Sequence, residues 1–309
     1  MVLKTSIVIR ALNEAAHLPA LLDGLESQDR KPDEVILVDS GSTDDTVAIA
    51  ETRGARILHI APEDFTFGRA LNIGCAAATG DILVFVSAHI YPTDRSWLEN
   101  LVAPFQDPAM ALSYGRQRGD DRTSFSETQV MQRWFPDVSD EDQRTPFCNN
   151  ANCAIRRTWW DQLPYDESLT GLEDLDWAHR ALARGGRIAY RADATIIHVH
   201  EESWQQTRNR YRREAIALNR ILPDQRIGAV KAASLLMLST LRDYASATRR
   251  GRIARDIARI PAFRAAQFLG AWEGGRQRGD VSVELQRRFY YPKGFFTSST
   301  RSDSSTARP

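Results

Sequence analysis

Short apolar runs alternate with amphipathic stretches over the first 90 residues of the chain. Runs rich in β-branched residues predict strands at 6–10, 35–38, 55–59 and 82–86. Apolar residues at helical spacing predict helices at about 15–28, 46–53 and 69–78. This alternation requires a parallel sheet with right-handed crossovers, because parallel strands are joined by segments that pass back over the sheet. We therefore expect an α/β fold, with a Rossmann-like, mostly parallel sheet flanked by helices.

Polar residues follow the predicted strands at their carboxyl ends. Asp39 ends the second strand, and Gly41 permits a tight turn after it. Ser42 or Thr43 could cap the next helix, as Asn13 could cap the first. In open α/β sheets, ligands bind outside the carboxyl ends of strands, so this edge is the expected ligand site.

The middle of the chain is less regular. We expect a strand at 109–116, a mobile and partly helical lid at 119–146, a helix at 157–162 and a helix that starts within 171–177. Two further strands are predicted at 188–190 and 195–199. His198 and His200 are two residues apart, so on a strand they face the same side.

The chain becomes helical and rich in arginine from Trp204 onward. Helices are predicted near 204–213, at 229–241 and at 253–269, and the Ser/Thr-rich tail at 297–309 is expected to be disordered. We expect three parts: a catalytic domain at 1–204, a basic helical extension at 205–296 and the tail.

Charge is distributed unevenly along the 309 residues, although the net charge is zero. Residues 1–204 carry 19 Lys and Arg against 32 Asp and Glu, whereas residues 205–309 carry 21 against 8. A basic third beside an acidic body favours an anionic partner: a membrane face, a phosphate-bearing acceptor or the acidic domain itself. Apolar and basic residues interleave at 253–269, which favours peripheral docking on an anionic membrane. We expect no nucleic-acid partner.

Cysteine usage and the absence of a leader pattern suggest a location. Cys75, Cys148 and Cys153 have no metal-type spacing and are interpreted as reduced thiols. Met1 is followed closely by a strand, without a signal peptide pattern. The apolar stretch at 232–241 is shorter than the ~20 residues that span a bilayer. We expect a cytoplasmic protein that could lie at the inner face of the cell membrane.

Four blocks of sequence together resemble a known family. They read R-A-L-N-E, V-D-S-G-S-T-D-D-T, A-T-G-D-I-L-V-F-V-S-A-H and G-L-E-D-L-D-W-A-H-R. Their order and spacing over residues 4–200 resemble family 2 glycosyltransferases, which have a nucleotide-sugar-binding GT-A fold. The segment H-V-H-E-E-S-W-Q-Q-T-R-N-R-Y-R-R is also similar to the C-terminal signature of rhamnosyltransferase-like bacterial members.

The resemblance implies roles for particular residues. Asp174 would be the general base that deprotonates the acceptor hydroxyl, and Glu173 would position the acceptor or share that role. The implied nucleotide-sugar-binding residues are Ala11, Asn13, Glu14, Asp39, Ser42, Arg69, Asn72 and Ser87. The implied reaction is inverting transfer from a UDP- or dTDP-linked sugar to a glycan or lipid-linked acceptor, in surface polysaccharide assembly.

One position departs from the family pattern. The usual Asp-x-Asp, which holds Mg²⁺ or Mn²⁺, is replaced by Ser87-Ala88-His89. Three interpretations remain open. His89 with His198 or His200 could hold a borderline metal such as Mn²⁺. The enzyme could instead be metal-independent, with His89 and arginines carrying the leaving-group charge, or catalysis could be lost.

Other interpretations stay open for the same residues. A single histidine is often structural, and acidic residues that open a helix also stabilise its dipole. Two rival functions are a sugar-nucleotide-binding protein with a decayed site and a sugar nucleotidyltransferase. The latter would need a Gly-rich, basic phosphate loop after the first strand, where this chain has A-L-N-E.

Overall fold

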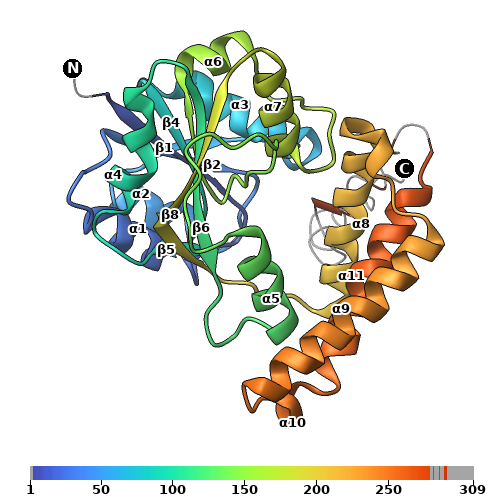
Figure 1. Cartoon of the computed structure of the whole chain (residues 1–309). Helices are drawn as coiled ribbons and strands as arrows, with labels where there is room; N and C mark the ends of the chain where they lie inside the picture. Colours follow the sequence, from blue (N-terminus) through green and yellow to red (C-terminus); the bar gives the residue numbers. More distant parts are fainter. Residues whose placement is uncertain (1–2, 279–280, 282–284, 286–288, 291–309) are drawn as a thin grey trace, which may run out of the picture.

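The computed structural model describes residues 3–278, 281, 285 and 289–290. Residues 5–198 form a helix-flanked sheet, and the helices that follow pack together along one side of it (Figure 1). The expected tail at 297–309 lies outside the described residues. Within these residues no helix is both long enough and apolar enough to cross a bilayer.

Within the described residues the sheet has eight strands, in the order β3-β2-β1-β4-β7-β6-β8-β5. The strands are β1 (Thr5–Ala11), β2 (Glu34–Asp39), β3 (Arg56–His59), β4 (Ile82–Ser87), β5 (Ile90–Pro92), β6 (Met110–Arg118), β7 (Asn152–Arg156) and β8 (Arg187–His198). The first four pair in parallel, as their apolar sequences predict. β7 runs antiparallel to β4 and β6, and β6 pairs in parallel with β8. The carboxyl ends of β1, β2, β4, β6 and β8 therefore meet at one edge.

Helices cover both faces of the sheet. They are α1 (Leu18–Glu26), α2 (Thr46–Thr52), α3 (Phe67–Ala77), α4 (Trp97–Val102), α5 (Phe125–Trp134), α6 (Arg157–Gln162) and α7 (Glu173–Ala183). The alternation along β1 divides the core, because Ile7 and Ile9 pack with α1 and α4, whereas Val8 packs on the opposite face with α3 and Trp177 of α7. Burial on both faces explains why the middle of β1, β2 and β4 is apolar.

The C-terminal region is a helical layer. It consists of α8 (Trp204–Ile221), α9 (Ala229–Arg249), the short α10 (Ile253–Asp256) and α11 (Arg259–Arg276). α11 packs on α8 and α9 and also touches α5 of the sheet domain. At that junction Arg264 forms a buried ion pair with Asp243, 2.8 Å between Nε and Oδ2, and Ser126 of α5 donates to the same carboxylate. The basic extension is thus joined to the rest of the chain by buried polar contacts.

Several predicted boundaries are wrong for identifiable reasons. The first helix starts at Leu18 rather than near residue 15, because Pro19 has no N–H to give and fits only a first turn. The predicted helix at 253–269 is broken before Arg259, since the ring of Pro261 would clash with the carbonyl four residues earlier. The predicted helix at 229–241 continues to Arg249, where Ala247 is buried.

Strand and cap predictions also need correction. The two strands expected at 188–190 and 195–199 are one strand, β8. Arg191 lies in the polar stretch between them, and its ion pairs with Asp193 and Glu141 balance its charge there. Neither Asn13 nor Ser42 caps a helix, since the residues at the caps are His17 and Asp45. Strand β5, which was not predicted, pairs with the end of β8.

Candidate active site

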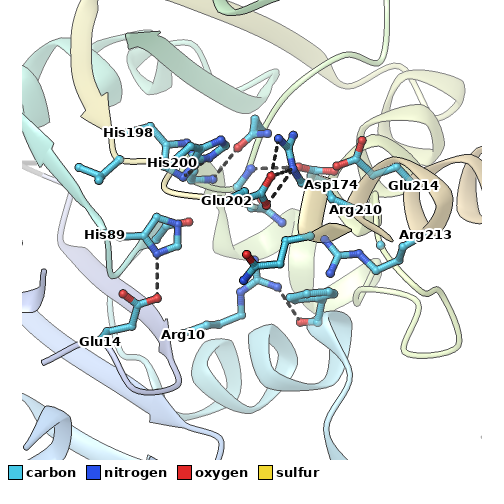
Figure 2. Close-up of a pocket in the computed structure, with 18 of the residues that line it drawn as sticks. Arg10, Glu14, His89, Asp174, His198, His200, Glu202, Arg210, Arg213 and Glu214 are labelled. Carbon is cyan, nitrogen blue, oxygen red and sulfur yellow. Dashed lines mark hydrogen bonds and ion pairs between the residues drawn. The ribbon is translucent and has the colours of Figure 1, made fainter. Parts of the chain in front are cut away.

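A cavity of about 530 Å³ opens at the carboxyl edge of the sheet. It lies where the ends of β1, β4 and β8 meet the start of α7 and the side of α8 (Figure 2). The polar residues of its wall include Arg10, Asn13, Glu14, Ser87, His89, Glu173, Asp174, His198, His200, Glu202, Arg210 and Arg213. Expected site residues from three of the four family-like blocks, and from the H-V-H-E-E segment, therefore surround one space.

The turns after β1 and β2 are joined by side-chain hydrogen bonds. The backbone N–H of Asn13 donates to Ser42 Oγ at 2.8 Å, and Asn13 Oδ1 accepts from the N–H of Thr43 at 2.7 Å. Asn13 has a φ of 55°, a left-handed conformation that asparagine tolerates better than most residues. Ala11 pairs with Asp39 across the two strands. Asn13 and Ser42 thus form one rigid corner beside the cavity.

Asp39 is almost fully buried and is partly used by its own turn. Its carboxylate accepts from the backbone N–H groups of Gly41 and Ser42 at 3.1 Å each. His59 Nδ1, at the end of the next strand, lies 3.4 Å from Asp39 Oδ2. The Asp39 carboxylate therefore stabilises the turn. A ligand can donate hydrogen bonds only to the oxygen lone pairs that the turn leaves free.

Five expected donor-site residues are absent from the cavity wall: Ala11, Asp39, Ser42, Arg69 and Asn72. Asn72 uses both ends of its amide inside the fold: its Nδ2 donates to the Tyr165 carbonyl, and its Oδ1 accepts from Trp160 Nε1. The Asn72 amide is therefore occupied inside the fold, and its place at the nucleotide stays a prediction. Arg69 has a half-exposed side chain that pairs with Asp64 at 3.5 Å and is also absent from the wall.

The two acidic residues that open α7 have different surroundings. Glu173 is buried and pairs with Arg10 at the end of β1, with Oε1 and Nη1 2.9 Å apart. Asp174 is also buried, and its carboxylate accepts from the N–H groups of Asn150 at 3.0 Å and Leu175 at 2.8 Å. Burial, together with the neighbouring charge of Glu173, raises the pKa of Asp174 to about 7. A carboxyl group with this pKa can both accept and release a proton near neutral pH.

Three histidines converge on the opposite side of the cavity. His198 Nε2 and His200 Nε2 are 3.1 Å apart, and the His89 ring stacks on the His198 ring with centroids 5.1 Å apart. Ligand atoms of the three residues all lie within 4.8 Å of one another. Burial, then the neighbouring His200 and His89, hold the pKa of His198 well below its usual range. The group has the residue types and spacing that can hold a metal ion.

Several residues of the site were missed from sequence. Glu127 of α5 pairs with His200 at 2.7 Å and with Arg210 of α8 at 2.6 Å. The cationic groups nearby reduce the pKa of Glu127 despite its burial. Arg210 belongs to the R-N-R-Y-R-R run, for which the sequence predicted a basic helix and a family-like signature but no role for a particular residue. Arg210 and Arg213 are three residues apart, so on a helix they share one face, but the local sequence does not show that this face lines the cavity.

Arg213 of α8 is also directed toward the cavity (Figure 2). Its guanidinium lies 4.6 Å from the centre of the Phe67 ring, and that of Arg10 lies 4.8 Å from the same ring. Burial lowers the pKa of Arg213, and its Nε atom has no hydrogen-bond partner. The neighbouring carboxylates of Glu214 and Glu173 act against this effect of burial and raise its pKa. A partly buried cation with an unpaired Nε atom is suited to bind an anionic ligand.

The chain matches proteins of known class. The sequence profile described as "Glycosyl transferase family 2" matches residues 6–163. The O-antigen chain rhamnosyltransferase RfbN of Salmonella typhimurium is 27% identical over 222 residues, which are 68% of this chain and 70% of that protein. The O-antigen chain rhamnosyltransferase WbaN of Salmonella anatum is 29% identical over 60% of this chain and 62% of its own length.

Solved structures share the fold. A mannosyltransferase of Pyrobaculum calidifontis, in complex with GDP-Man and Mn²⁺, superposes with a TM-score of 0.62 at 18% identity, covering 95% of this chain and 88% of that one. Glucosyl-3-phosphoglycerate synthase of Mycobacterium tuberculosis, with Mn²⁺, UDP and glucosyl-3-phosphoglycerate, gives 0.54 at 24% identity, covering 73% and 83%. The fold is therefore that of GT-A glycosyltransferases.

Proposed function

Because this chain belongs to glycosyltransferase family 2, we propose that it transfers a hexosyl or deoxyhexosyl group from a nucleoside diphosphate sugar to an acceptor hydroxyl, with inversion. That it is a glycosyltransferase follows from the family match and the rhamnosyltransferase relatives. One observation carries the finer proposal: the buried Asp174 carboxylate lines the same cavity as the histidines and Arg213. A base and an anion-binding group thus flank one space large enough for a sugar.

Inverting transfer needs a base opposite the leaving group. In our proposal Asp174 takes the proton from the acceptor hydroxyl while that oxygen bonds to the anomeric carbon. The bond from the anomeric carbon to the nucleoside diphosphate breaks in the same step, and its electron pair leaves with the diphosphate. The ion pair of Glu173 with Arg10 holds the start of α7 against β1, and so keeps Asp174 in position.

The leaving diphosphate needs positive charge. A divalent cation, when bound by the histidines, would neutralise developing negative charge on the diphosphate oxygens. Mn²⁺ is present in the structures of two fold relatives, which supports a cation in this site. The three imidazoles are suitable donors, although the usual carboxylate pair is absent. Arg213 would add a charge-assisted contact to the same diphosphate, because its Nε atom has no hydrogen-bond partner among the described residues.

The donor and acceptor are proposed from the relatives. Two relatives are named as rhamnosyltransferases of O-antigen chains, so a deoxyhexosyl donor linked to dTDP or UDP is the preferred candidate. The corner formed by Asn13 and Ser42, with Glu14 and Ser87 beside it, would bind the nucleoside part. The acceptor would be a growing glycan or a lipid-linked sugar in surface polysaccharide assembly.

One face of α9 favours an anionic membrane as a partner. Val230, Met237 and Leu241 are 82%, 59% and 57% exposed, and their spacing places them on one side of the helix. Lys231 and Arg242 each follow a member of this apolar stripe, so they flank it. Exposed apolar residues beside basic ones suit the headgroup region of an anionic bilayer, where a lipid-linked acceptor would lie.

The transfer reaction can be tested on the full chain. Purified protein is supplied with a dTDP- or UDP-linked sugar and a lipid-linked acceptor, and the anomeric configuration of the product is read by NMR. Asp174→Asn should lower the rate about 10²- to 10⁴-fold, the range expected for loss of a general base, with little change in donor binding by calorimetry. Asp176→Asn is the matched control, since Asp176 pairs with Arg180 on the same helix.

The rival functions predict different results. A binding protein with a decayed site would bind the nucleotide but form no product, and Asp174→Asn would change nothing. A nucleotidyltransferase would release diphosphate from a nucleoside triphosphate and a sugar phosphate. Product with retained configuration would also contradict the assignment of Asp174 as the base.

A further inference from the structure

The three histidines of the cavity have a common hydrogen-bonding arrangement. In each ring the Nδ1 atom has a side-chain oxygen as its partner: Glu14 Oε1 for His89 at 2.8 Å, Gln117 Oε1 for His198 at 2.8 Å and Glu127 Oε1 for His200 at 2.7 Å. Since carboxylate and amide oxygens accept hydrogen bonds, each Nδ1 carries the proton and donates. In the neutral rings the lone pairs are therefore on the Nε2 atoms.

The amide of Gln117 is itself oriented, which fixes the assignment for His198. Gln117 Nε2 donates to Asn149 Oδ1 at 3.0 Å, so Gln117 Oε1 is the atom that faces the ring. His200 is oriented by Glu127, which Arg210 of α8 holds from its other side. Carboxylates and amides that hold the distal nitrogen of a histidine are the usual second layer of a metal site.

This arrangement leaves two lone pairs facing each other. His198 Nε2 and His200 Nε2 are 3.1 Å apart, yet neither has a proton to share when both rings are neutral. Two nitrogens bound to one ion, each about 2.1 Å from it, are roughly 3 to 3.4 Å apart. The observed separation fits an ion between them. His89 is the third candidate ligand, since its ligand atom lies within 4.8 Å of the other two (Figure 2).

We propose that His89, His198 and His200 bind one divalent transition-metal ion, of the Zn²⁺ and Co²⁺ type, in preference to Mg²⁺. Imidazole nitrogen is a borderline ligand that favours such ions, whereas Mg²⁺ requires oxygen ligands. The nearby carboxylates of Glu14 and Glu127 orient the rings and do not replace the missing Asp-x-Asp. The role of the ion at the diphosphate rests on the proposed function, but its binding by the histidines does not.

Direct metal binding tests the proposal. The full chain is dialysed against EDTA and then against buffer, and Co²⁺ is titrated while visible absorption is recorded. One Co²⁺ per chain should bind, with the ligand-field bands of nitrogen coordination, and Zn²⁺ should displace it. Mg²⁺ at millimolar concentration should leave the spectrum unchanged.

Variants separate the triad from other histidines. His198→Ala and His200→Ala should each weaken Co²⁺ binding at least about 100-fold, and Glu127→Gln about 10- to 100-fold, as for other residues that orient metal ligands. His179→Ala, on the exposed side of α7, is the control and should bind normally. Circular dichroism confirms that each variant is folded, and a triad variant that has lost its fold is replaced by His89→Gln.

The outcomes are distinct from those of the transfer assay. Undiminished Co²⁺ binding by the triad variants, equal affinity for Mg²⁺, or the absence of any bound ion would overturn the proposal. If transfer persists in EDTA with no ion bound, a shared proton and not a metal ion lies between His198 and His200. The metal proposal then fails, and the proposed transfer reaction stands. If the ion binds but no sugar is transferred, the metal site stands and the proposed function fails.

Discussion

Arg10 and Glu173 are 163 residues apart in the sequence but form an ion pair of 2.9 Å between the end of β1 and the start of α7. Their side chains are 20% and 7% exposed. Leu172, just before Glu173, has a φ of 55°, an unfavourable conformation for a branched side chain that is often found at functional sites. The pair and this backbone conformation together direct the first turn of α7 into the cavity.

The pair should be important for stability because it is largely buried. Arg10→Gln should reduce the free energy of unfolding by about 3 kcal/mol, since Glu173 is left buried without its partner. Adding Glu173→Gln should recover part of that loss. The measurement is urea unfolding followed by circular dichroism.

An exposed pair provides the control for this prediction. Arg95 and Asp29 form an ion pair at 2.9 Å, but their side chains are 73% and 63% exposed. Arg95→Gln should therefore change the free energy of unfolding by about 1 kcal/mol or less. Similar losses for Arg10→Gln and Arg95→Gln would contradict the structural role assigned to the buried pair.

The pH dependence of transfer should follow Asp174. The pKa of this group is raised to about 7, mainly by burial and then by Glu173. A base acts only when deprotonated, so kcat/KM should fall about tenfold for each pH unit below 7 and level off above it. The profile is measured between pH 5.5 and 9 with saturating metal ion.

A variant can show which group causes the acid limb of the profile, that is, the fall in kcat/KM at low pH. Glu173→Gln removes a neighbouring negative charge and releases Arg10, and both changes favour the ionised form of Asp174. The acid limb should therefore move to lower pH. A limb that does not move, or that moves to higher pH, would mean that another group controls the profile.

Arg213 should contribute to binding of the diphosphate rather than the nucleoside. Arg213→Ala should weaken binding of UDP or dTDP about 10- to 100-fold, the effect of losing a hydrogen bond to a charged group. Binding of the corresponding nucleoside should hardly change. Calorimetry with both ligands measures the difference.

The control for Arg213 is a basic residue of the same helix that lies outside the cavity. Arg220 bonds the Ser168 carbonyl at 3.2 Å and is absent from the cavity wall. Arg220→Ala should leave both affinities unchanged. An equal loss of nucleoside and diphosphate binding in Arg213→Ala would indicate a disturbed fold instead of a lost phosphate contact.

The apolar stripe of α9 should bind anionic vesicles. The full chain should sediment with vesicles that contain phosphatidylglycerol, and binding should weaken with salt. Met237→Asp with Leu241→Asp should abolish sedimentation, since charged side chains cannot enter the bilayer surface. Val138→Asp, at a 77% exposed apolar position of the sheet domain, is the matched control. Binding that survives the α9 changes would remove α9 as the membrane contact.

The central strands could be predicted because burial on both faces leaves a clear apolar signal. The pairing of β1, β2 and β4 and the turns after them follow from that pattern and from the α/β alternation. The convergence of the blocks that carry Asn13, Asp39 and Ser87 on one edge was predictable for the same reason. Pro19 and Pro261 also mark helix boundaries in the sequence. The predicted first helix nevertheless started before Pro19, and the helix predicted at 253–269 ran through Pro261.

Sequence alone determined the α/β class, the ligand edge and the residue types available for chemistry, because these depend on local periodicity and on the direction of parallel strands. Only the tertiary structure brought His89 to His198 and His200. Strands β7 and β6 lie between β4 and β8 in the sheet. The chain nevertheless passes directly from β4 to β5, where Ile90 pairs with His198, and this brings the adjacent His89 to the end of β8. The partners that orient the rings come from β6, α5 and the turn after β1. Such long-range packing leaves no periodic signal, which is why Glu127, Arg210 and Arg213 could not be assigned from their local sequence.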